Sequence, residues 1–176
     1  AAGAVASAMS IPVAVWSVRH PSARASAVEI ASRAGFALPG IVIALALVFF
    51  VSRYLMPLYQ TLALLVIAYV IRFLPEALAA SRAAFASVSR TFEEAARSLG
   101  ATELGALRSL TLPLLRPGLL AGAGLVFLTA MKELPATLVL RPAGFETLAT
   151  RIWSTAAEGI YSQAALPGLV LVAISA

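Results

Sequence analysis

The 176-residue sequence contains no cysteine and only one histidine, His20. The absence of cysteine excludes a disulfide framework, a thiolate metal site and a thiol nucleophile within this stretch. A GxxxxGK[ST] phosphate-binding loop is also absent, and His20 has no recognisable catalytic or metal-ligating partner. The residues therefore give no indication of an enzyme active site, a metal site or a cofactor.

Charge is also scarce, since only 12% of the residues are charged and 61% are hydrophobic. This much apolar surface exceeds what one small core can bury, so the excess must face lipid or partner subunits. Charge is absent from residues 1–18, 34–52, 54–71, 117–131 and 159–176. About 20 apolar residues cross a bilayer core. We therefore predict an all-α integral membrane protein with about five transmembrane helices, the fourth extended to Pro113–Met131.

The basic residues give a net charge of +5, but they separate the hydrophobic runs and form no patch, so nucleic acid is not an expected partner. Their distribution predicts that residues 19–33 and 72–116 are cytoplasmic. The arginines on that side are Arg19, Arg24, Arg33, Arg72, Arg82, Arg90, Arg97, Arg108 and Arg116. The smaller opposite group is Arg53, Lys132, Arg141 and Arg151. Both ends of the sequence are apolar, so we expect residues 1–176 to form a single partial domain, truncated at both ends.

The polar loop at about 75–112 has signals for two short helices. Thr91 followed by Glu94 fits a capping box, and Gly100 suits the left-handed position after a helix. Thr102 is a second helix-capping candidate. Two short helices joined at a glycine would form a peg that fits a partner's groove. The alternative is a solvated linker.

The same loop carries a spaced motif. Glu94-Ala95-Ala96 is followed after three residues by Gly100, and after nine more by Leu110-Thr111-Leu112-Pro113. This pattern resembles the EAA motif of ABC importer permeases, with leucine where isoleucine is common. The stretches ALPGIVIALALVFF, LYQTLALLVIAYVIRFLPEAL and LLRPGLLAGAGLVFLTAMKELPATLVLRPAGFETLATRIW are similar to the ferric-iron group of these permeases.

The resemblance implies a type I importer (MetI-like) transmembrane domain in the bacterial inner membrane, and this piece is most similar to a C-terminal permease half. In such importers the EAA loop couples the movement of cytoplasmic ABC ATPase subunits to the membrane helices. The permease has no ATPase site of its own. An extracytoplasmic binding protein delivers the substrate, and another permease half completes the pathway. The implied coupling residues are Glu94, Ala95, Ala96, Gly100, Leu110, Leu112 and Pro113.

A second constellation begins the outer loop at about 132–158. Ionisable residues beside lipid favour a functional site, and Pro135 would break the helix there. The candidate translocation-path residues are Lys132, Glu133, Pro135 and Thr137. The alternative is an interfacial helix end, because neighbouring side chains point to different faces. Further on, Leu148, Ile152 and Trp153 have helical spacing, which predicts a surface helix or a platform for the binding protein.

The substrate assignment rests on the resemblance of the KELPAT and RPAGFETLATRIW stretches to the ferric-iron group of permeases, which implies ferric iron. The spans hold no aspartate and no acidic pair that would form a metal cage. Permeases for thiamine, sulfate or polyamine share the EAA loop and stay as alternatives. Two other classes are an ion-coupled secondary transporter, which needs intramembrane charges or repeated broken helices, and a structural membrane subunit, which needs no cytoplasmic peg.

Overall fold

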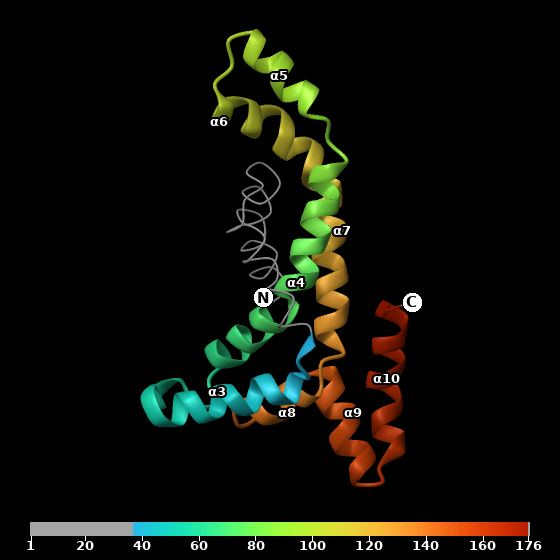
Figure 1. The fold of residues 1–176 in the computed structure, drawn as a ribbon. Coiled ribbons are helices and arrows are strands. Elements are labelled where there is room, and N and C mark those ends of the chain that lie inside the picture. The colour runs from blue at the N-terminus through green and yellow to red at the C-terminus, as the bar shows by residue number, and fades with distance from the viewer. Residues whose placement is uncertain (1–36, 176) are drawn as a thin grey trace.

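The computed structural model describes residues 37–175, and all regular secondary structure in that range is helical (Figure 1). The span predicted at 1–18, His20 and the arginines at 19, 24 and 33 lie outside the described residues. The α-helices are α3 (Gly40–Tyr54), α4 (Leu62–Ala86), α5 (Arg90–Ser98), α6 (Glu103–Ala106), α7 (Leu112–Met131), α8 (Pro135–Leu140), α9 (Leu148–Ala157) and α10 (Tyr161–Ser175). A 3₁₀ turn, Met56–Leu58, follows α3, and a π-helical turn, Leu107–Thr111, joins α6 to α7.

Two long helices form the axis of the described chain. Helices α4 and α7 pack side by side, with α5 and α6 beyond one end and α8 and α9 at the other (Figure 1). Two helical stretches, Leu62–Phe85 and Leu104–Met131, are long and apolar enough to cross a membrane. They confirm that the third and fourth predicted spans correspond to apolar helices of membrane-spanning length, but the third lies at Leu62–Phe85 and not at the predicted 54–71.

Helix α10 covers Tyr161–Ser175 of the predicted fifth span, 159–176. The second predicted span is shorter than expected, because residues 34–52 are long enough to cross a bilayer but α3 has only 15 residues. At 1.5 Å per residue, such a helix reaches about 22 Å, less than the bilayer core of about 30 Å. Pro39 is the N-cap residue of α3, a position near the start of a helix where proline is well tolerated.

Helix α4 extends well past the predicted start of the polar loop. The loop was expected from about residue 75, but α4 continues to Ala86 with Pro75 inside it. The continuation is stabilised by packing, since Leu78, Ala84 and Phe85 are buried against α7. Arg72 therefore lies near the middle of a spanning helix, and its assignment to the cytoplasmic arginines is wrong.

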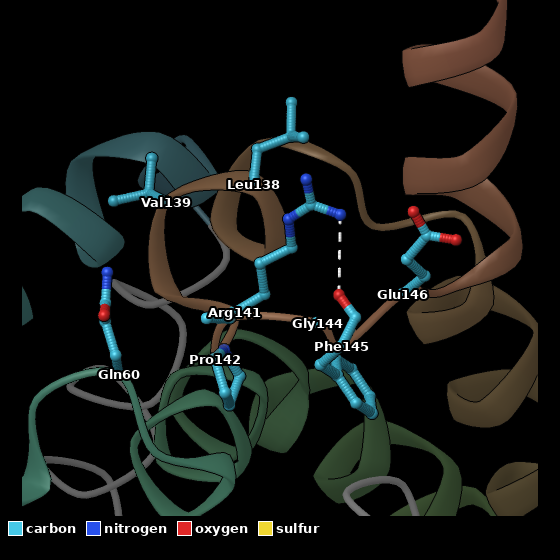
Figure 2. A pocket seen from close by; sticks show the side chains of 9 residues that line it. Gln60, Leu138, Val139, Arg141, Pro142, Gly144, Phe145 and Glu146 are labelled. Carbon is cyan, nitrogen blue, oxygen red and sulfur yellow. Dashed lines mark hydrogen bonds between the residues drawn. The ribbon is translucent and has the colours of Figure 1, made fainter.

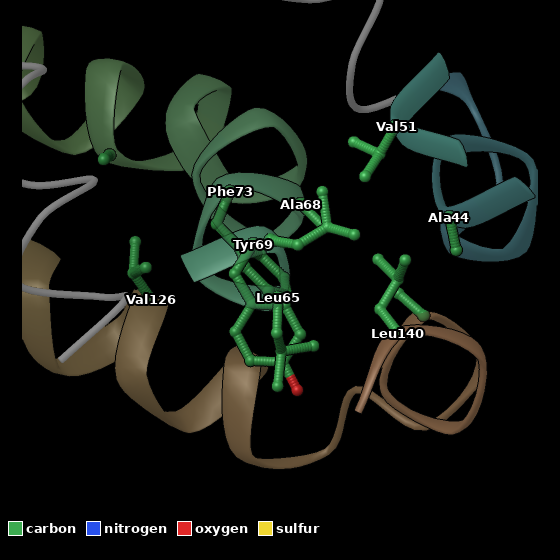
Figure 3. Close-up of a cluster of buried hydrophobic side chains, with 11 residues drawn as sticks. Ala44, Val51, Leu65, Ala68, Tyr69, Phe73, Val126 and Leu140 are labelled. Carbon is green, nitrogen blue, oxygen red and sulfur yellow. The ribbon is translucent and has the colours of Figure 1, made fainter. Parts of the chain in front are cut away.

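The main apolar core surrounds the place where α3, α4, α7 and α8 meet. Val51 from α3 points toward α4, which contributes Leu65 and Phe73, whereas Ala44 from α3 points toward α8 (Figure 3). Leu140 from α8 closes the cluster and is 1% exposed. Because side chains from four helices share this core, it fixes the position of the short segment between α7 and α8.

Candidate coupling and translocation sites

Helices α5 and α6 form a hairpin that projects from the ends of α4 and α7 (Figure 1), and we call it the α5/α6 hairpin. Helix α5 begins at Arg90, and its N-cap is Ser89, whose Oγ accepts a hydrogen bond from the Thr91 amide at 3.2 Å. The sequence predicted Thr91 as the cap, two residues too late. Serine and threonine are both good caps, so pattern alone did not separate them.

The turn of the hairpin is a Schellman motif at Gly100. Its φ of +90° is in the left-handed region, as predicted. The Gly100 amide donates to the Arg97 carbonyl and the Ala101 amide donates to the Ala96 carbonyl, both at 3.0 Å. These two bonds satisfy carbonyl groups at the end of α5 that would otherwise lack partners. Ala96 is buried beneath the turn.

The second arm of the hairpin leads directly into the membrane helix. Thr102 caps α6 as predicted, because its Oγ1 accepts from the Gly105 amide at 3.1 Å. Between α6 and α7 the helix widens into a π turn, in which the Leu112 amide donates to the Leu107 carbonyl. Pro113 follows in the first turn of α7. The motif residues Leu110, Leu112 and Pro113 therefore lie where the hairpin joins the span.

The hairpin has an uncovered apolar surface. Phe92 is 57% exposed, Leu99 is 89% exposed and Leu104 is 58% exposed. Glu94 and Ala95 are exposed on the same hairpin. Large apolar side chains left exposed on a projecting element are typical of a surface that binds another protein.

At the other end of α7 the chain breaks before α8. Helix α7 ends at Met131 and α8 begins at Pro135, so the predicted helix break is present; we call residues 132–134 the α7/α8 break. Lys132 is exposed, whereas Glu133 is half-buried. Glu133 lies just before Leu134, the N-cap residue of α8, and its Oε1 accepts a hydrogen bond from the Ala136 amide at 3.3 Å. The two neighbouring charges therefore point to different faces.

Side chains of α4 hold the break and the first turn of α8. The Thr137 hydroxyl donates to the Glu133 carbonyl at 2.6 Å, which leaves its oxygen to accept a hydrogen bond from the Tyr69 hydroxyl. Arg72 Nε lies 3.9 Å from Glu133 Oε2. Glu133 and Thr137, predicted for the translocation path, are thus engaged with α4.

A further polar contact lies one turn along α4. The Thr129 hydroxyl donates to Glu76 Oε1 at 3.0 Å. Sequence reasoning missed Glu76 and misplaced Arg72, although the spacing of Tyr69, Arg72 and Glu76 by three and four residues puts them on one face of a helix. That spacing was the available signal, and it has meaning only once α4 is known to continue past residue 75.

The segment after α8 forms a turn and then α9. The predicted helical spacing is confirmed by α9, whose start is closed by a capping box between Thr147 and Thr150. Trp153 is 54% exposed.

A hollow of about 440 Å³ is lined by Gln60, Leu138, Val139, Arg141, Pro142, Ala143, Gly144, Phe145 and Glu146 (Figure 2). Arg141 donates to the Phe145 carbonyl at 3.4 Å and so closes this turn.

No group of three or more histidine, cysteine, aspartate or glutamate side chains comes together to hold a metal ion within residues 37–175. The described residues thus form a projecting hairpin with exposed apolar side chains and a polar helix break, joined by two long helices.

Removing the Tyr69 hydroxyl tests the contact between α4 and α8. We expect Tyr69→Phe to lower the free energy of unfolding of the full-length protein by about 1 kcal/mol, because Thr137 loses a buried hydrogen-bond donor. Thermal unfolding in detergent measures this change. Tyr54→Phe is the matched control, since Tyr54 is 64% exposed at the end of α3. Equal effects of the two substitutions would contradict the prediction.

Comparison with known proteins gives a family and several relatives. The family described as binding-protein-dependent transport system inner membrane component matches residues 6–176. The Fe(3+)-transport system permease protein FbpB 2 of Haemophilus influenzae is 41% identical over 139 residues, which are 79% of this chain and 28% of that protein. A probable molybdenum ABC transporter permease protein of Haloferax volcanii is 40% identical over 68% of this chain and 44% of its own length. A putative 2-aminoethylphosphonate transport system permease protein, PhnV of Salmonella typhimurium, is 39% identical over 51% of this chain and 34% of its length.

Proposed function

The chain belongs to the family of binding-protein-dependent transport system inner membrane components, and from this premise we propose that it is part of the permease of an ATP-driven importer. It spans less than half of the length of the first two relatives. The other permease half, the cytoplasmic ATPase subunits and the extracytoplasmic binding protein are proposed partners, in a bacterial inner membrane. The ATPase subunits, and not this chain, hydrolyse ATP.

The α5/α6 hairpin is the proposed docking element for the ATPase. The observation that carries this proposal is its exposed apolar surface at Phe92, Leu99 and Leu104, held at the ends of two membrane-spanning helices. Exposed Ala95 allows close approach to a partner, and exposed Glu94 can pair with a basic residue there. Because α6 runs through the π turn into α7, a force on the hairpin acts directly on a spanning helix.

The α7/α8 break is the proposed part of the translocation path. Non-helical backbone at membrane depth is tolerated only where protein covers it or where it lines a watery cavity. Exposed Lys132 and Pro135 are the residues of the break region available to a passing substrate. Glu133 and Thr137 hold the segment in place through their contacts with α4.

Ferric iron is the proposed substrate. The support is the similarity of 79% of this chain to a protein named as a Fe(3+)-transport permease. A molybdenum-containing substrate is the second candidate, because a relative with that name is 40% identical. Thiamine, sulfate and polyamine stay as further alternatives. We propose that the binding protein supplies the selectivity, since residues 37–175 bring no cluster of metal-ligating side chains together.

The test is uptake of radioactive ferric iron by cells that carry the full-length parent with its partners. We expect ATP-dependent uptake by the parent and about a tenfold decrease in Glu94→Lys, because reversing a charge at a docking surface costs about 1.4 kcal/mol or more. Co-purification of the ATPase with the permease should fall in parallel.

The matched control is Glu158→Lys, which makes the same change at an exposed position after α9, at the end remote from the hairpin. Unchanged uptake in Glu94→Lys would contradict the docking role. A parent that takes up no iron would contradict the substrate, and molybdate, thiamine, sulfate and polyamine uptake would then be measured.

A further inference from the structure

Helices α4 and α7 form an antiparallel pair that connects the α5/α6 hairpin to the α7/α8 break. Near the hairpin the two backbones are in close contact, because a methyl group added at Gly118 would lie 2.7 Å from the Ala84 Cβ. Further along, Thr129 bonds to Glu76, and the last pair before α8 is Glu133 with Arg72. Contacts between α4 and α7 therefore occur along the whole length of α7, from the hairpin to the break.

Three elements converge on the last of these pairs. Arg72 Nη1 donates to the Leu38 carbonyl at 2.9 Å, just before α3, while Nε faces Glu133 at 3.9 Å. Gly40 lies against the Glu133 carboxylate so closely that an added Cβ would collide with Oε1. The side chains are only 24% and 12% exposed. Arg72 therefore connects the start of α3, the middle of α4 and the break.

We propose that Arg72 and Glu133 are the positioning pair that makes the α7/α8 break move together with α4 when the hairpin moves. This inference rests on the proposed permease function. Charges at membrane depth are costly, and removal of one partner leaves the other unpaired. The pair therefore stays together while the helices rearrange, and the break follows α4. Replacement of both charges by neutral amides removes the penalty of leaving one charge unpaired.

A reporter next to the pair measures this movement. Lys132 is exposed, and the sequence has no cysteine, so Lys132→Cys gives a single labelling site in this region of the full-length permease. Cysteines elsewhere in the parent are replaced by serine. The complete transporter is reconstituted in liposomes, and the rate of labelling by a membrane-impermeant maleimide is compared with ADP and with vanadate-trapped nucleotide. We expect the two rates to differ by about fivefold or more, as is typical of coupled sites.

Three variants of the Lys132→Cys reporter protein test whether Arg72 and Glu133 act as a pair. Arg72→Gln should bring the two labelling rates to within about twofold, because unpaired Glu133 no longer follows α4. Arg72→Gln with Glu133→Gln should restore at least about half of the difference, since the pair acts as a unit. Arg53→Gln, an exposed arginine at the end of α3, should change nothing.

Two kinds of result would overturn the pairing role. One is a nucleotide-dependent difference that persists in Arg72→Gln or is absent from the reporter parent. The other is a double variant that is no better than Arg72→Gln, which would mean that the two residues act separately. A merely structural role would instead lower the yield of assembled complex and leave the ratio of the two rates unchanged. Failure of the proposed function is distinct, because the ATPase would then not co-purify with the parent.

Discussion

Replacement of Gly100 by valine is expected to abolish ATP-driven uptake while the permease still accumulates in the membrane. The backbone there has a φ of +90°, which a β-branched residue strongly disfavours. Nothing lies within 4 Å of a Cβ added at Gly100, so valine causes no collision and acts only through the backbone. Loss of the left-handed turn breaks both Schellman bonds and redirects α5 relative to α6. The docking surface is then lost although the membrane helices are unchanged.

Uptake and ATPase co-purification of the full-length Gly100→Val transporter check this prediction. Gly100→Asn is the matched variant, because asparagine tolerates the left-handed region and should retain most of the uptake. Immunoblots of the membrane fraction establish equal amounts of permease. If Gly100→Val transported as well as Gly100→Asn, the shape of the hairpin would be irrelevant to coupling.

The features of the hairpin that sequence predicted are those fixed by neighbouring residues. A glycine after a helix and a threonine before the next one act within a few residues, so Gly100 and Thr102 were assigned correctly. Ser89 and Thr91 have similar capping chemistry and lie two residues apart, and the structure has Ser89 as the cap. Motif spacing therefore located the hairpin, but not its first residue.

The polar contacts at the break could not be read from the sequence, because they join distant parts of the chain. Tyr69 and Thr137 are 68 residues apart, and Thr129 and Glu76 are 53 apart. Arg72 resembled the charged end of a span because the residues before it are apolar and Glu76 follows. Its pairing with Glu133 makes a mid-helix arginine tolerable, and only the three-dimensional arrangement shows that pairing.

Replacement of Gly122 by leucine is the second change with a large expected effect, and it should prevent stable accumulation of the permease. Gly122 is buried on α7, and an added Cβ would lie 2.5 Å from the Ala80 Cβ on α4. Ordinary contacts between such atoms are more than 3.4 Å apart. Leucine must therefore force the two helices apart, at a cost of about 1–3 kcal/mol or more. In a membrane, close approach at small residues supplies much of the helix association, so this loss has few compensations.

A Cβ added at Gly122 would collide with the Ala80 Cβ, so a compensating substitution at Ala80 can test this contact. Gly122→Ala alone should lower the thermal stability of the full-length permease, and the double variant Gly122→Ala, Ala80→Gly should recover it because the colliding methyl group has been moved to the other helix. Gly124→Leu is the control on the same helix, since Gly124 is exposed and an added Cβ has no neighbour within 4 Å. Equal losses from leucine at Gly122 and Gly124 would mean that the α4/α7 contact is not the cause, because leucine is a better helix former than glycine at both positions. Recovery in the double variant would instead show that the close approach of α4 and α7 at Gly122 and Ala80 contributes to the stability of the permease.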